Sequence, residues 1–350
     1  MLILGIESSC DETAASVVED GQNILSNIVA SQIDVHRRFG GVVPELASRK
    51  HIESINLVVE EALSEAKVSL ADISACAVTY GPGLVGSLLI GLSFAKGLAY
   101  SRNIPLIGIN HLEGHIYAAY LDQPQPPEVL PLPEVLPLCL PAIALIVSGG
   151  HTELVRVNEW GNYELLGRTI DDAVGEAFDK AAKLLNLGYP GGPIIDILAK
   201  EGNSQAVKFP RALWRKKAFD FSLSGVKTSL INFLKNQNNL PAKEEACLVK
   251  VEDVVASFQE AIVDVLVDKA VKAAKDHQLK NIILCGGVAA NTRLKQRLSD
   301  SAQKEGMTVY YPSIKLCTDN AAMIAGLGYV KYRKGEFAPL SLNADPNLKL

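Results

Sequence analysis

Two of the chain's six histidines stand four positions apart, in the segment His111-Leu-Glu-Gly-His115. On a helix this spacing places both imidazoles on one face, where they can chelate a single cation. An ordinary pair of exposed or core histidines would show the same spacing, so a metal site needs a third ligand. Asp319 is the candidate, because it follows a strand-like run and ligands gather in strand-to-helix loops of open α/β sheets. An Asp just before a helix is also a common N-cap.

Glu113 bears on the kind of enzyme that the histidine pair would serve. In the HExxH motif of zinc peptidases the glutamate directly follows the first histidine, where it acts as the general base. Here it stands one position further on, about 200° round a helix from His111. A metallopeptidase is therefore disfavoured. It remains an alternative, as do an ATP-dependent small-molecule kinase and a binding module that nucleotide switches between conformations.

Small-residue turns recur after strand-like runs and suit a phosphate ligand. They are Glu7-Ser-Ser-Cys-Asp11, Gly81-Pro-Gly83, Ser148-Gly-Gly150 and Gly286-Gly287. Backbone amides in such turns can approach a phosphate closely, so the set could hold a polyphosphate. None of them matches GxxxxGKS or GxGxxG, and each alone could be an ordinary tight turn.

Four carboxylates fall close together at the start of one expected helix. Asp171 and Asp172 suit capping of its N-terminus, with Glu176 in the following turn. Asp179 lies two turns inside the helix. If it faces a cleft, it could accept hydrogen bonds from a ligand hydroxyl or amine.

The richest basic stretch interleaves cations with aromatic rings between Lys208 and Lys217. Such a stretch could bind backbone phosphate and stack a base, although a solvated loop would have the same composition. The candidates for nucleic-acid contact in it are Arg211, Trp214, Arg215, Lys216 and Lys217.

Composition limits the classes of protein to which the chain can belong. Its 350 residues, 48% hydrophobic and 21% charged, indicate a globular protein with two domains rather than a disordered or coiled-coil chain. The net charge of -5 excludes coating of nucleic acid by bulk charge. Widely spaced cysteines, no leader-like segment and no uninterrupted apolar span favour a reducing cytoplasm and no membrane.

Alternating β-rich and helical runs predict an α/β fold. We expect strands at Leu2–Ile6, Ala14–Val18, Ala75–Tyr80, Ile104–Ile109, Ala142–Val147, Thr152–Val157, Asn281–Cys285 and Thr308–Tyr311. We expect helices from Pro44, at Leu84–Tyr100, Asp172–Asn186, Gly225–Lys235 and Glu252–Asp276, from Asn291, and near Asn320–Arg333, with a loop at Tyr189–Pro193. The two halves open alike, which indicates a duplication, and a Pro-rich segment at 123–141 reads as an extended connector.

The motifs, in their order, resemble the TsaD family, the catalytic subunit of tRNA threonylcarbamoyladenosine synthase once described as an O-sialoglycoprotein endopeptidase. The segments that carry the resemblance span residues 5 to 325 and are GIESSCDETAASVV, FGGVVPELASRKH, GPGLVGSLLIG, NHLEGH, LIVSGGHTELV, IDDAVGEAFDKAAKLL, YPGGP, FSLSGVKT, CGGVAANTRL and CTDNAAMIA. The main departure is the Pro-rich segment, which is longer than the link in shorter relatives.

The resemblance implies a two-lobed α/β architecture of the actin-like, sugar kinase and Hsp70 (ASKHA) type with duplicated βββαβα lobes. The first lobe would comprise 1–122 and about 315–350 and carry the metal ligands. The segment 123–141 would connect it to a second lobe, 142–314, that binds nucleotide. The implied reaction transfers a threonylcarbamoyl group from threonylcarbamoyl-AMP to the exocyclic 6-amine of adenosine at position 37 in tRNAs that read codons starting with adenine, releasing AMP.

Site residues and partners follow from the same resemblance. His111, His115 and Asp319 match the ligands of one divalent metal, with iron favoured over zinc or magnesium. Asp11 and Glu12 match acidic residues of the first phosphate turn and are the candidates for catalysis there. The positions that match binding of threonylcarbamoyl-AMP, or of ATP or ADP, are Ile146, Val147, Ser148, Gly149, Gly150, Asp179, Gly192, Asp196 and Asn291. The implied partners are tRNA, a paralogous scaffold subunit (TsaB), a small ATPase (TsaE) and the synthase that makes the adenylate (TsaC).

Overall fold

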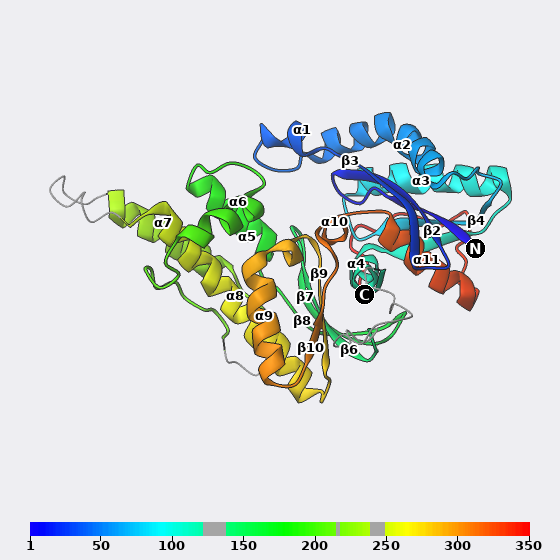
Figure 1. Cartoon of the computed structure of the whole chain (residues 1–350). Coiled ribbons are helices and arrows are strands. Elements are labelled where there is room, and N and C mark those ends of the chain that lie inside the picture. Colours follow the sequence, from blue (N-terminus) through cyan, green and yellow to red (C-terminus); the bar gives the residue numbers. More distant parts are fainter. Residues whose placement is uncertain (122–137, 215–217, 239–248) are drawn as a thin grey trace. The chain divides into compact units, whose positions relative to one another are not determined.

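The computed structural model describes residues 1–121, 138–214, 218–238 and 249–350. Most of the Pro-rich segment and the tRNA-contact candidates Arg215, Lys216 and Lys217 lie outside the described residues. The chain forms two compact units (Figure 1). Unit 1 comprises Met1–Leu138 and Tyr311–Leu350, and unit 2 comprises Cys139–Tyr310.

Unit 1 is built on a five-stranded mixed sheet in the order β3-β2-β1-β4-β5. An antiparallel meander forms one side of the sheet, with β1 at Leu2–Glu7, β2 at Glu12–Glu19 and β3 at Asn23–Ser31. β4 (Ile73–Gly81) and β5 (Leu106–Asn110) continue the sheet in parallel with β1. The central strands are almost fully buried because helices cover both faces of the sheet.

The helices of unit 1 form two layers on this sheet (Figure 1). α2 and α3 pack on one face, and α4 and α11 pack on the other. Gly5 in β1 lets α11 approach closely, since an added Cβ would lie 2.4 Å from the Ala321 carbonyl oxygen. The helices are α1 (Ile33–Arg37), α2 (Pro44–Ala66), α3 (Val85–Arg102), α4 (His111–Leu121), α10 (Ile314–Cys317) and α11 (Ala322–Lys334).

Unit 2 repeats the same sheet with the order β10-β9-β6-β7-β8. Its antiparallel meander is β6 (Ala142–Val147), β7 (Thr152–Glu159) and β8 (Asn162–Arg168). β9 (Asn281–Cys285) and β10 (Thr308–Tyr310) run parallel to β6. Three antiparallel strands followed by two parallel strands thus occur twice, which confirms the duplicated α/β lobes expected from the sequence.

The helices of unit 2 include the longest one among the described residues, α8, whose apolar face packs on the sheet. They are α5 (Val174–Leu184), α6 (Gly191–Leu198), α7 (Ser224–Asn238), α8 (Val251–Asp276) and α9 (Thr292–Lys304), with short 3₁₀ turns at Ala199–Glu201 and Gly287–Ala290. None of the described helices is both long and apolar enough to cross a membrane.

Two expectations about local structure are wrong. The segment Tyr189–Pro193 is not a loop throughout, because Gly191 begins α6 and Pro193 lies in its first turn, where a backbone N–H has no partner within the helix. β3 and β8 were not expected as strands. Both are outer strands with many half-exposed or exposed side chains, so their apolar signal is weak.

Candidate metal centre and nucleotide-binding residues

The histidine pair lies at the point where β5 ends and α4 begins. The Asn110 side chain accepts a hydrogen bond from the Leu112 backbone N–H at 2.8 Å, so it caps the first turn of α4. His111 and His115 follow one turn apart on the same helix face, with ring centroids 4.6 Å apart and 78° between their planes. Both are buried. The helix expected from their spacing is present.

Asp319 joins them from the turn between α10 and α11. Its Oδ1 lies 3.1 Å from His115 Nε2 and 3.4 Å from His111 Nε2. Ligands about 2.1 Å from one tetrahedral ion lie roughly 3.4 Å apart, so these separations suit a shared metal. The three donor atoms lie within 4.8 Å of one another. The two nitrogens and one carboxylate oxygen therefore fit a single divalent ion, and all belong to unit 1.

Asn320, and not Asp319, caps the first turn of α11. Asn320 Oδ1 accepts a hydrogen bond from the Met323 backbone N–H at 3.1 Å, and Asn320 Nδ2 donates to the Thr318 carbonyl oxygen at 2.9 Å. These bonds hold the turn and leave the Asp319 carboxylate directed at the histidines.

Glu7, which in the sequence stands out only as part of a small-residue turn, lies behind His111. His111 Nδ1 is 3.1 Å from Glu7 Oε2 and 3.1 Å from Ser9 Oγ. Burial works against a charged imidazole, but the carboxylates of Asp319 and Glu7 raise the pKa of His111 to about 9. Burial also opposes the Glu7 carboxylate, yet the neighbouring His111 lowers the pKa of Glu7 below its ordinary value. The two buried groups stabilise each other's charges.

The turn after β1 carries Asp11 and Glu12, and His51 from α2 holds it. His51 Nε2 donates to the Cys10 carbonyl oxygen at 2.9 Å, and His51 Nδ1 lies 2.8 Å from Thr13 Oγ1. His51 was not expected as a site residue, and the one sequence feature that marks it is its place in the segment FGGVVPELASRKH. Burial, with smaller contributions from Asp11 and Asp319, raises the pKa of Glu12 to about 8 despite a hydrogen bond from Ser31.

Glu113 contacts Lys331 of α11, with 2.9 Å between Oε2 and Nζ. Both side chains are largely buried. Because Glu113 pairs with Lys331, it is not placed to act as the general base of a metallopeptidase. Its position about 200° round the helix from His111 leads to the same conclusion.

The glycine turn of unit 2 offers open backbone. Ile146 and Val147 end β6 with fully buried side chains, so only their backbone could reach a ligand. In the following turn Ser148 donates its N–H to the His151 carbonyl oxygen at 2.8 Å. Gly149 and Gly150 are exposed, and nothing lies within 4 Å of an added Cβ at either one.

The β9 turn lies beside the β6 turn. Gly286 has a φ of 89°, and an added Cβ there would lie 2.4 Å from the Val147 carbonyl oxygen. A left-handed conformation in close contact with a strand end requires glycine. Two of the four small-residue turns are therefore adjacent, as a phosphate-binding surface would need.

The remaining predicted binding residues form two hydrogen-bonded groups in unit 2. Asp179 Oδ1 accepts from the Gly191 N–H at 2.7 Å, next to Gly192, whose backbone is open. Asp196 accepts from the Thr292 N–H at 3.1 Å and from its hydroxyl at 3.0 Å.

Asn291, one position before Thr292, is also held at both ends of its side chain. It caps α9 through the Leu294 N–H at 2.8 Å and donates to Gln259 Oε1 at 2.8 Å. Gln259, which the sequence did not single out, fixes the orientation of this amide.

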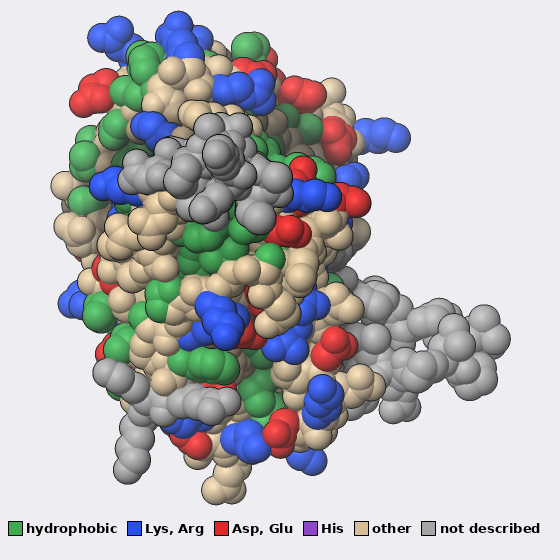
Figure 2. Space-filling model, turned by 90° about the vertical axis from the view of Figure 1, so that its left-hand side faces the viewer, with side chains coloured by type: hydrophobic (Ala, Val, Ile, Leu, Met, Phe, Trp, Pro, Cys, Tyr) green, Lys and Arg blue, Asp and Glu red, His purple; other side chains and the backbone are tan. Residues whose placement is uncertain are grey.

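Where the basic stretch is described, Arg211 and Phe209 already have partners within the protein. Arg211 is bound to Asp264 through Nε at 3.1 Å and Nη2 at 2.9 Å, and Phe209 is buried in the core. Neither the charge of Arg211 nor the ring of Phe209 is free for a nucleic acid. Lys/Arg and Asp/Glu side chains are also interspersed on the face in Figure 2.

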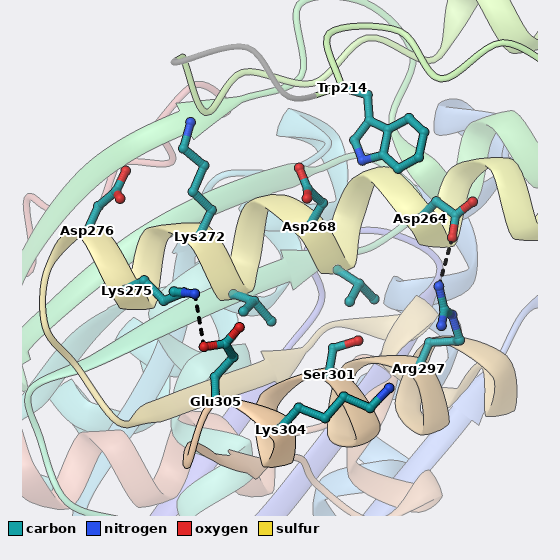
Figure 3. Close-up of a pocket in the computed structure, with 12 residues that line it drawn as sticks. Trp214, Asp264, Asp268, Lys272, Lys275, Asp276, Arg297, Ser301, Lys304 and Glu305 are labelled. Atoms are coloured by element: carbon teal, nitrogen blue, oxygen red, sulfur yellow. Dashed lines mark hydrogen bonds and ion pairs between the residues drawn. The ribbon is translucent and has the colours of Figure 1, made fainter.

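Trp214 lies over a pocket of about 620 Å³ between α8 and α9 (Figure 3). Its acidic lining residues are Asp264, Asp268, Asp276 and Glu305, and its basic ones are Lys272, Lys275, Arg297 and Lys304. Acidic and basic groups are equal in number, and Lys275–Glu305 and Arg297–Asp264 are already paired. The pocket is therefore not a basic surface for phosphate.

Fold and site together define a two-lobed α/β protein of the ASKHA type with a His-His-Asp group suited to a metal. Solved structures agree on the fold. Component A of (R)-2-hydroxyglutaryl-CoA dehydratase from Acidaminococcus fermentans superposes with a TM-score of 0.54 at 15% identity, over 95% of this chain and 99% of that one. HypF from T. kodakarensis gives 0.59 at 14% identity, over 96% of this chain and 48% of that one.

Sequence comparison identifies the family. The family model of TsaD, tRNA N6-adenosine threonylcarbamoyltransferase, matches residues 23–326. Curated proteins of that name from Clostridioides difficile (strain 630) and Clostridium perfringens (strain 13 / Type A) are each 54% identical to this chain, over 100% of it and 98% of each relative. The chain belongs to the TsaD family and is a transferase.

Proposed function

We propose that this chain transfers the threonylcarbamoyl group of threonylcarbamoyl-AMP to the exocyclic 6-amine of adenosine 37 in tRNAs that read codons starting with adenine. The amine nitrogen forms a bond to the carbamoyl carbon, the bond from that carbon to the phosphate oxygen breaks, and the amine loses one proton. AMP leaves as the second product.

The observation that carries the proposal is the convergence of His111, His115 and Asp319 on one point in a TsaD-family chain. Two imidazole nitrogens and one carboxylate suit iron or zinc better than magnesium, which prefers oxygen ligands, and we propose Fe²⁺. When bound, the ion would supply a Lewis acid for the carbamoyl-phosphate anhydride and its leaving phosphate.

Unit 2 offers the groups for the adenylate. Backbone amides of the exposed Gly149-Gly150 turn would bind phosphate, and the open backbone at Gly192 would allow close approach of the nucleoside. Asp179 would accept from a ribose hydroxyl. Asp196 and Asn291 are held by Thr292 and Gln259, so they would shape this surface rather than move toward a ligand.

Asp11 and Glu12 are the candidates in unit 1 for contact with phosphate or for accepting the amine proton. With a pKa of about 8, Glu12 is mostly protonated at neutral pH, but its ionised form is a stronger base than an ordinary carboxylate. Attack at an activated carbonyl depends chiefly on positioning, so one such acceptor is sufficient.

Turnover would involve partners in a cytoplasmic setting: tRNA, a scaffold subunit (TsaB), an ATPase (TsaE) and an adenylate-producing synthase (TsaC). The net charge of -5 supports tRNA binding that is shared among subunits. Exposed Ile52 on α2, and Val85 and Leu89 on α3, support a protein partner on unit 1.

The test is transfer of labelled threonine and bicarbonate to unmodified tRNA with the partner proteins supplied. Label should enter tRNA only when this chain is present. Asp319→Asn should abolish transfer, whereas Asp276→Asn, at an exposed position of α8, should not. Labelling that does not depend on the chain would refute the proposal.

A further inference from the structure

We infer that Glu7 is a positioning residue for the metal centre: it accepts the Nδ1 proton of His111 and so directs the Nε2 lone pair toward the ion. The inference rests on the proposed metal centre and adds to it a residue that is not itself a ligand. It concerns unit 1 alone.

The direction of the Glu7 side chain follows from its place in β1. Side chains alternate along a strand, so residues 5 and 7 share a face. An added Cβ at Gly5 would touch Ala321 and Ala325, at the start of α11. Glu7 therefore faces the side of the sheet where α11 and α4 pack, and where the turn that carries Asp319 lies.

The Glu7 carboxylate is fixed on both oxygens. Oε1 accepts from the Ser9 N–H at 2.5 Å, and Oε2 accepts from Thr79 Oγ1 at 2.6 Å. The residue has no exposed surface. A carboxylate buried this completely costs free energy unless its partners compensate. Among the residues that the structure describes, the imidazole of His111 is the cationic group within ion-pair distance of it, at 3.1 Å.

This arrangement selects the tautomer of His111. Nδ1 faces Glu7 Oε2 at 3.1 Å, whereas Nε2 faces Asp319 Oδ1 at 3.4 Å. With the proton held at Nδ1, Nε2 is the nitrogen left to bind a cation. A carboxylate behind a ligating imidazole fixes the ring and increases its basicity as a ligand.

His115 provides a contrast within the same site. Its Nε2 faces Asp319 at 3.1 Å, but its buried Nδ1 has no hydrogen-bond partner among the residues that the structure describes. Loss of Glu7 should therefore act on the metal through His111.

The experiment measures Co²⁺ binding to the full chain after chelation, from the visible absorption of the bound ion. Glu7→Gln keeps the size of the side chain and removes its charge. The matched control is Glu113→Gln, which removes another buried glutamate of unit 1 from the helix that carries both histidines. Thr79→Val is a milder variant that keeps Glu7 and removes one of the groups that hold it. Circular dichroism and thermal unfolding show that each variant is folded.

We expect Glu7→Gln to weaken Co²⁺ binding by about 10- to 100-fold and to change the absorption spectrum, because these are the usual effects of losing such an outer partner. Thr79→Val should weaken binding less, and Glu113→Gln should leave affinity and spectrum unchanged. If the native chain binds one Co²⁺ and folded Glu7→Gln binds it equally well, the inference is wrong and the metal centre stands. If the native chain binds no Co²⁺, the metal centre of the proposed function fails with it.

Discussion

Glu113 Oε2 and Lys331 Nζ lie 2.9 Å apart and join the helix that carries both histidines to α11. The two side chains are only 11% and 17% exposed, so the pair is shielded from solvent. Its role is structural: it fixes α4 against the helix that follows Asp319.

We predict that Glu113→Gln destabilises the protein without reducing transfer by the folded enzyme. Breaking a shielded pair leaves Lys331 partly uncompensated, so the free energy of unfolding should fall by up to about 3 kcal/mol. Urea denaturation and single-turnover transfer at low temperature check both parts. If the folded variant instead carries out the chemical step 100-fold more slowly, Glu113 acts as a general base.

Asp319 and Asn320, which are adjacent in sequence, should give opposite results. Asp319→Asn removes a charged metal ligand, so metal affinity should fall at least 100-fold. The chelated protein should keep its stability to within about 1 kcal/mol, because the lost attraction to His111 is offset by the lost repulsion from Glu7, Asp11 and Glu12. Asn320→Ala removes the cap on Met323 N–H and should cost about 1–2 kcal/mol. Metal titration and urea denaturation of both variants separate metal binding from helix capping. If Asp319→Asn lowers stability and Asn320→Ala does not, Asp319 is the residue that caps α11.

Glu12 should make the metal-free protein less stable at alkaline pH. Its pKa is about 8 in the folded chain and near the ordinary 4.5 when unfolded, so the folded state binds the extra proton between these values. Its contribution to stability is present below pH 4.5 and is lost as the pH rises through 8. His111, with its pKa of about 9, acts in the same direction.

We therefore predict that Glu12→Gln flattens the pH dependence of stability by a few kcal/mol between pH 5 and 9. Urea midpoints of the chelated protein at pH 5, 7 and 9 provide the comparison, and the part due to His111 remains in both proteins. Parallel curves for native and variant protein would show that Glu12 is ionised in the folded state at neutral pH.

Arg211→Ala should reduce stability rather than tRNA affinity, because two hydrogen bonds hold the Arg211 guanidinium on Asp264. Loss of a double contact to a half-buried carboxylate should cost about 1–3 kcal/mol. The salt dependence of tRNA binding should not change, since no phosphate contact is removed. A shallower salt slope in the folded variant would show that Arg211 leaves Asp264 for the nucleic acid.

Local patterns were sufficient to predict the elements that position the metal ligands. The spacing of His111 and His115 indicated α4, and buried apolar runs located the central strands of both sheets. The duplication was also visible, because each half begins with β-rich runs around a small-residue turn. We expected the first lobe to end at 122 and to resume at about 315. In the structure, unit 1 ends at Leu138 and resumes at Tyr311.

The features that sequence did not reveal depend on contacts between distant residues. Glu7 lies 104 positions from His111, and nothing near Glu7 in sequence indicates that contact. The roles of Asp319 and Asn320 could not be assigned, because both residue types cap helices. The start of α6 was not predicted, because the Gly-Gly-Pro sequence at 191–193 is equally typical of a loop.

His115 and Asp319, which face one point in unit 1, are 204 residues apart in the chain. A ribosome adds about 5–20 residues per second, so the second ligand emerges roughly 10 to 40 s after the first. The whole of unit 2, from Cys139 to Tyr310, is made in that interval and can fold before unit 1 has its last helix. We therefore expect metal acquisition to be a late event, after translation, and a nascent chain to carry no complete site.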